Sequence, residues 1–185
     1  ENAVVQGGTH IVAQGTTTIG QSLFGGGNAA ATGIEWGTVT SIVDIAGAII
    51  EENVYGGANS SVIYGNTVVN VGNKAINDYY GQDKGFTQGK IDIKGTIYGG
   101  GEQMDLTSTN YNYDTVSVEG NILINIDGTG YTTGVNTLNI GHSIFGSGHA
   151  SRAAIPQNVG GNKIFPSEDN NGVINILMFD FCFLS

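Results

Sequence analysis

One short pattern recurs four times along this chain: an aliphatic residue, then an aromatic residue, then two or three small residues that are mostly glycine. The copies occupy residues 19–27, 50–57, 93–101 and 140–148, and their aromatic residues are Phe24, Tyr55, Tyr98 and Phe145. These aromatics are 31, 43 and 47 residues apart. A motif that recurs at variable spacing indicates that one structural corner is rebuilt several times while the segments between corners differ in length.

Short segments in which apolar and polar residues alternate lie between the four copies. Alternation with a period of two that ends at glycine or asparagine predicts a β-strand. No segment shows helical periodicity, so we expect an all-β chain. The predicted strands are residues 38–45, 67–71, 90–93, 115–118, 121–126, 137–140 and 173–176.

The repeated corner favours one architecture, a right-handed single-stranded parallel β-helix (β-solenoid) with loop insertions, in a single domain over residues 1–185. Glycine, 31 of the 185 residues, is costly in helices but allows tight corners and close approach of successive coils. We expect the aliphatic and aromatic residues to point inward and to stack in ladders at about 4.8 Å. Coils of roughly 20–25 residues predict seven or eight coils. The alternative is an irregular β-sandwich in which the glycines form ordinary hairpin turns.

The variable spacing marks three insertions, at residues 73–89, 101–114 and 148–172, and insertions in solenoids become loops that often serve recognition. Two of them combine aromatic with polar residues. The rings would stack on sugars while carboxylates accept hydrogen bonds from hydroxyl groups, although the same tyrosines would serve equally to cover the flank of the solenoid. The candidate binding residues are Tyr79, Tyr80, Asp83, Phe86, Glu102, Asp105, Tyr111 and Tyr113.

The segment 174–185 is far more apolar than the rest of the chain. We expect it to cap the stack or to be the next coil cut short, and we expect the chain to be part of a longer protein. Open solenoid ends expose strand edges, which makes end-to-end self-association a further expectation.

Charge and apolar patterning exclude some partners. Six basic residues stand against 16 acidic ones, for a net charge of -10, and nucleic-acid binding needs clustered lysine and arginine. The sequence contains no run of about 18 apolar residues, so we predict no membrane span. The single cysteine, Cys182, forms no internal disulfide.

The sequence offers little chemistry, and we predict no catalytic residue, no metal site and no cofactor. His142 and His149 flank the fourth corner at a spacing that fits no usual zinc motif, and any calcium would be incidental because no calcium-loop motif is present. The alternative function is a polysaccharide-binding or polysaccharide-degrading domain. A glycosidase needs two carboxylates, and the close acidic pairs are Glu51/Glu52, Glu102/Asp105 and Glu168/Asp169.

The repeated unit Ile-x-Gly-x-x-aliphatic-aromatic-Gly-Gly-Gly resembles bacterial surface proteins of the β-helical adhesin type, including autotransporter-like passenger domains and glycine-rich surface proteins. The resemblance covers residues 15–148, and the fourth copy departs from it with Gly146-Ser147-Gly148. It implies an extracellular or cell-surface location and a structural or adhesive role, with a glycan or a host or matrix protein as partner. It implies no catalytic residue.

Overall fold

The computed structural model describes residues 4–34, 39–102, 117–131 and 136–149, together with short strands at 152–153, 158–159, 162–163 and 174–179. The described part of the chain is mostly β, with parallel sheets and one short helix.

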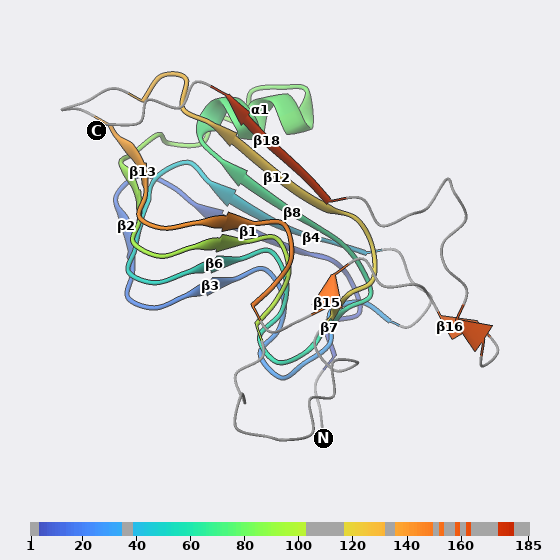
Figure 1. The fold of residues 1–185 in the computed structure, drawn as a ribbon. Coiled ribbons are helices and arrows are strands. Elements are labelled where there is room, and N and C mark those ends of the chain that lie inside the picture. The colour runs from blue at the N-terminus through green and yellow to red at the C-terminus, as the bar shows by residue number, and fades with distance from the viewer. Residues whose placement is uncertain are drawn as a thin grey trace.

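Four parallel sheets contain most of the strands, and the strands of each sheet come from well-separated parts of the sequence (Figure 1). Sheet 1 has the order β1 (Thr9–Ala13), β4 (Val39–Ile45), β8 (Gly65–Val71), β12 (Ile122–Asp127), β18 (Ile174–Phe179). Sheet 2 has the order β2 (Thr17–Ile19), β5 (Ala48–Ile50), β9 (Ile91–Ile93), β13 (Leu138–Ile140). Sheet 3 has the order β3 (Leu23–Phe24), β6 (Val54–Tyr55), β10 (Ile97–Tyr98), β14 (Ile144–Phe145). Sheet 4 has the order β7 (Val62–Ile63), β11 (Ser117–Val118), β15 (Arg152–Ala153).

From β4 onward the chain visits sheets 1, 2, 3 and 4 in turn and then returns to sheet 1 beside the strand it left. In the first passage, from β1 to β4, sheet 4 is contacted by an isolated bridge of Thr32 to Ile63. We call one such passage a circuit. Register partners in successive circuits are the equivalent residues, as in Leu23 with Val54 and Val54 with Ile97. A separate pair, β16 (Asn158–Val159) and β17 (Asn162–Lys163), is antiparallel.

The predicted strands are confirmed where the structure describes them, with small shifts at their ends, and residues 115, 116 and 173 of two predicted strands lie outside the described residues. The predicted coil number is wrong. Partners in sheet 1 are separated by 32, 26 and 55 residues, so five strands of that sheet use up the described chain. The strands within each of the four larger sheets are parallel. The glycine corners are therefore not the hairpin turns that the alternative, a β-sandwich, would require.

The interior is aliphatic and lies between sheet 1 and sheets 2 and 3. The strands of sheet 1 contribute one side of it, with Val43, Ile45, Val69, Val71, Ile124 and Ile126. The facing strands contribute Ile50, Val54, Ile91, Ile93 and Ile97. All of these side chains are buried, and each stabilises the fold by about 1.5–3 kcal/mol through removal of apolar surface from water.

A row of hydroxyl groups crosses this interior and reaches the glycine corners. Thr9, Ser41 and Thr67 are register partners in sheet 1. Their hydroxyls donate to the carbonyl oxygens of Gly25, Gly56 and Gly99 at 2.6, 3.0 and 2.7 Å. In the next circuit the register position belongs to Ile122.

The approach of the two sheets at these corners leaves no room for a side chain. A Cβ at position 25 would lie 2.5 Å from Ser41 Oγ, and one at position 99 would lie 2.3 Å from Ile122 Cγ2. Glycine is therefore required at the first glycine position of the first three motifs, Gly25, Gly56 and Gly99.

The aromatic residues of the motif form the predicted ladder. The ring centroids of Phe24 and Tyr55 are 4.6 Å apart, those of Tyr55 and Tyr98 are 4.9 Å apart, and those of Tyr98 and Phe145 are 5.5 Å apart. Offset stacking of such rings contributes beyond the burial of their area.

The prediction that the aromatics point inward is wrong. Side chains alternate along a strand, and Val54 belongs to the interior cluster while a Cβ on Gly56 would meet Val69 and Thr67 of sheet 1. Tyr55, between them, faces outward. Tyr55 is nevertheless fully buried and is stacked between Phe24 and Tyr98, whereas Phe145 is 48% exposed.

The prediction that the chain has no helix is also wrong. Asn73–Tyr80 forms the helix α1, which begins after Gly72 at φ 97° and ends at Gly81 in the left-handed conformation. The helix packs on the outer side of sheet 1, against β4, β8 and β12 (Figure 1). Its buried residues are Ala75 and Ile76.

We predict that Gly56→Ala destabilises the protein by about 1–3 kcal/mol, the usual cost of overpacking. The new Cβ would lie 2.5 Å from the carbonyl oxygen of Gly99. Gly20→Ala is the matched control because nothing lies within 4 Å of its Cβ position. Urea unfolding measures the difference in free energy of unfolding. Equal stability of the two variants would contradict the role given to the corner.

Candidate functional site

The candidate site is built from α1 and the segment that follows it, residues 73–89, on the outer face of sheet 1. Four of the predicted binding residues, Tyr79, Tyr80, Asp83 and Phe86, belong to this segment. The insertion is therefore a docked helix and turn, held to the sheet through the buried face of α1.

A buried carboxylate lies beneath the end of α1. Asp44, in β4, is fully buried, and its Oδ2 is 2.7 Å from His10 Nε2 and 2.9 Å from the Tyr80 hydroxyl. Asn70 Nδ2 donates to Oδ1 at 2.7 Å. An ionised carboxylate only accepts hydrogen bonds, so we assign the proton of the His10 ring to Nε2.

This cluster continues as a ladder of amides along sheet 1. Asp44, Asn70 and Asn125 are register partners, and Asn125 Nδ2 donates to Asn70 Oδ1 at 2.7 Å. Each buried polar atom thereby gains a partner, which removes the cost of burying it unpaired.

The two tyrosines of α1 differ in their contacts. The Tyr80 hydroxyl is bonded to Asp44 and lies 3.1 Å from His10 Nε2. Burial, followed by the hydrogen bond to Asp44, raises the pKa of Tyr80 well above its ordinary value, so this phenol stays protonated and donates. Tyr79 packs edge-on against Tyr80 at 4.9 Å between centroids. Burial, with the nearby charge of Asp44, raises the pKa of Tyr79 as well.

The turn after α1 is ordered by its own polar groups. Asp83 is exposed, and its Oδ1 accepts from the Gly85 backbone N–H at 2.8 Å. Asn73 Nδ2 donates to the carbonyl oxygen of the half-buried Phe86 at 3.1 Å. Lys84 Nζ lies 4.4 Å from the centre of the Tyr80 ring, a cation–π distance.

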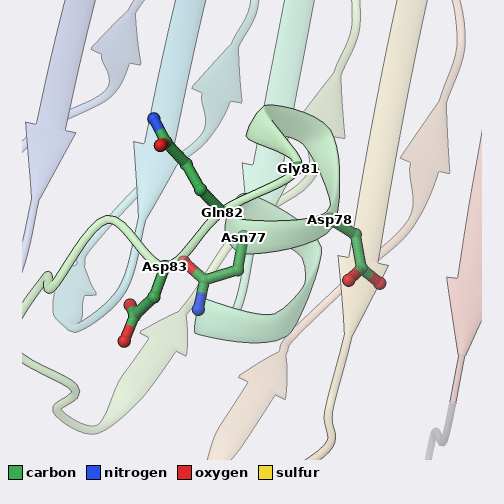
Figure 2. Close-up of a pocket in the computed structure, with 5 residues that line it drawn as sticks. All are labelled: Asn77, Asp78, Gly81, Gln82 and Asp83. Atoms are coloured by element: carbon green, nitrogen blue, oxygen red, sulfur yellow. The ribbon is translucent and has the colours of Figure 1, made fainter.

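A shallow hollow of about 460 Å³ lies at the end of α1, lined by Asn77, Asp78, Gly81, Gln82 and Asp83. Figure 2 shows that the side chains of Gln82, Asp83 and Asp78 extend in different directions and do not converge on one point. Asp78 forms an ion pair with Lys74. The hollow offers hydrogen-bonding groups along its rim.

Glu102 lies elsewhere, at the corner after sheet 3. Its position pairs with Asn59 in one circuit and His149 in the next, and His149 Nδ1 is 3.5 Å from Glu102 Oε1. Burial and then a hydrogen bond to Glu102 raise the pKa of the Tyr55 phenol. Glu102 therefore supports the aromatic stack and is not grouped with the residues of α1. Asp105, Tyr111 and Tyr113 lie outside the described residues.

Two residues of the site, His10 and Asp44, were not singled out by the sequence reading. They are 34 residues apart, and Asp44 is 36 residues from the predicted Tyr80. His10 and Asp44 meet through the register of sheet 1. His142 is exposed at the fourth corner.

Among the described residues, no group of three or more His, Cys, Asp or Glu side chains could hold a metal ion. Within the same ranges, no helix has the length and apolar character needed to cross a membrane.

No protein-family model, curated protein or solved structure matches this chain.

A second charged cluster lies on sheet 2 around Asp92, which is 4% exposed. Lys90 and Lys94 donate to its Oδ2 at 2.8 and 2.6 Å, and Asn139 Nδ2 donates to Oδ1 at 2.9 Å. Burial alone would raise the pKa of this carboxyl, but these three hydrogen bonds outweigh burial and hold the pKa well below its ordinary value.

We predict that Asp92→Asn lowers the free energy of unfolding by about 1–2 kcal/mol at neutral pH, because hydrogen bonds to the charged group are lost. A depressed folded-state pKa gives stability that is present above the unfolded value, about 3.9, and is lost as pH falls. Wild type and variant should therefore converge in strong acid. Chemical denaturation at a series of pH values measures this, with the exposed Asp78→Asn as control. A difference that persists unchanged below about pH 3 would contradict the assignment.

Proposed function

We propose that this chain is a segment of right-handed parallel β-helix from a bacterial cell-surface or secreted protein, a stalk on which residues 73–89 form an adhesive surface. The partner is a glycan, or a host or matrix protein. The observation that carries the proposal is the division of the described chain into register-matched ladders and one inserted segment docked on their outer face.

A general rule supports the right hand. Connections between parallel strands of one sheet are right-handed in about 98% of cases. The return from β4 to β8 through sheets 2, 3 and 4 is a connection of this kind.

The role of a stalk rests on how such an array is stabilised. Neighbouring circuits contact each other at equivalent positions, as between Thr9 and Ser41 in the hydroxyl row, between the rings of the aromatic stack and along the amide ladder. The stability of the array is then a sum of contacts between neighbouring repeats, and further repeats can be added through the same contacts.

The adhesive role rests on the chemistry of the segment 73–89. Half-buried Tyr79 and Phe86 present ring surface, while exposed Gln82 and Asp83 present groups that bond to hydroxyls. Carboxylates at Asp78 and Asp83 line the hollow, so neutral glycans are favoured over uronates and sialylated chains, whose carboxylates these groups repel.

We predict that Tyr79→Ala weakens binding to a neutral oligosaccharide by about tenfold, the effect of losing one aromatic contact worth about 1–1.5 kcal/mol. Tyr79 is chosen over Tyr80 because the Tyr80 hydroxyl is hydrogen-bonded to Asp44 of the sheet, so that its removal would also affect the attachment of α1. Calorimetry against a panel of neutral and acidic oligosaccharides, with and without calcium, provides the measurement.

Phe145→Ala is the matched control, since Phe145 is an exposed aromatic on sheet 3. Unchanged affinity in this variant distinguishes a specific site from nonspecific binding to exposed aromatic rings. Equal binding by wild type and Tyr79→Ala would overturn the assignment of the surface. Release of reducing or unsaturated ends during incubation would instead support the alternative, a polysaccharide-degrading domain.

A further inference from the structure

We propose that the open edge of sheet 2, at β13, is a docking surface for residues 181–183 of this same chain, which form the next strand of that sheet. Among the described strands, sheet 1 has five and sheet 2 has four, so the edge at β13 is one strand short of the edge at β18. Residues 180–185 lie outside the described residues. The proposal concerns the fold and does not rest on the proposed function.

The edge of β13 offers both apolar side chains and backbone donors. Ile91 and Ile93 of β9 are fully buried, whereas their register partners Leu138 and Ile140 are only partly buried. The N–H of Gly141 donates to the carbonyl oxygen of Ile93, and successive N–H groups of a strand point to opposite sides. The N–H groups of Leu138 and Ile140 therefore point away from β9, toward the open edge.

The spacing along the chain brings residues 181–183 to this edge. In sheet 1, Met178 occupies the register position that Ile45 occupies three circuits earlier. Only residues 46 and 47 separate Ile45 from the first residue of β5 in sheet 2. A link of the same length after Met178 places residue 181 at the start of the next strand of sheet 2.

The side chains of this segment match the pattern of sheet 2. Leu138 and Ile140 pack against the interior, and Asn139 between them is exposed. Beside β13, the two phenylalanines of residues 181–183 lie over Leu138 and Ile140, and Cys182 lies next to Asn139 on the outer face. The interior thereby gains one more layer, and apolar surface of the rings and of β13 is removed from water.

A link of three residues, as between Ala13 and β2, would shift the register by one residue and turn Phe183 outward. The middle residue of that link is Gly15, which has φ 68°. Its counterpart in the tail is Asp180, and the left-handed conformation is less favourable for aspartate than for glycine. The two-residue link is therefore the better match.

The variant Asn139→Cys tests this register through the native Cys182. Register partners on neighbouring strands lie about 4.7–4.9 Å apart, within the Cα separation of roughly 4.4–6.8 Å that a disulfide spans. Mild oxidation of the dilute protein should join position 139 to Cys182 within one molecule, as detected by peptide mapping. Thr18→Cys is the matched control, because Thr18 is exposed on β2, at the opposite edge of sheet 2, and should remain unbridged.

Absence of a bridge in Asn139→Cys overturns the proposal. A bridge that forms only between two molecules also overturns it, because a second copy then occupies the edge. An intramolecular bridge from position 18 to Cys182 contradicts the register.

Amide hydrogen exchange tests the docked strand without a change in β13. In wild type the amides of Leu138 and Ile140 should be protected, because carbonyl groups of the next strand accept their hydrogen bonds. Phe183→Ala should lower this protection by about tenfold or more, since large-to-small substitutions at buried positions are costly. Leu184→Ala, at the sheet position of the exposed Lys94, should leave it unchanged. Rapid exchange of both amides in wild type, or equal effects of the two variants, counts against the proposal.

Discussion

The close contact between sheet 1 and the glycine corners of sheet 3 is the constraint on which the rest of the structure depends. Hydroxyls of Thr9, Ser41 and Thr67 donate to glycine carbonyl oxygens across the interior, and no Cβ fits at those corners. The residue before each glycine must then face outward and the residue before that inward. This alternation places the aromatic stack on the outside and the aliphatic core within.

The same register organises the outer face of sheet 1. Because equivalent positions of successive circuits are neighbours, Asp44, Asn70 and Asn125 form one hydrogen-bonded row. A buried carboxylate in that row is stable only with donors around it, and His10 and Tyr80 supply two of them. The helix α1 is thereby attached to the sheet through polar groups at its end and apolar groups along its buried face. A rigid array that carries one attached segment is the arrangement on which the proposed stalk and adhesive surface depend.

The strands and the aromatic ladder could be predicted from the sequence because both depend on local alternation and on a repeated motif. The number of circuits could not, since segments such as 73–89 lengthen a circuit without a change in its strands. The helix left a usable signal: Ala75, Ile76, Tyr79 and Tyr80 are spaced as on one face of a helix, between Gly72 and Gly81. The meeting of His10 with Asp44 left none, because only the pairing register of β1 with β4 brings them together.

The order of the aromatic stack tests the central claim, in-register parallel packing of successive circuits, most directly. Phe24, Tyr55, Tyr98 and Phe145 contact one another only in that sequence. Nuclear Overhauser measurements on protein with labelled aromatic rings should show contacts for Phe24 with Tyr55, Tyr55 with Tyr98 and Tyr98 with Phe145, and none between Phe24 and Tyr98. Contacts between non-consecutive rings, or no contacts among the four, would contradict the account.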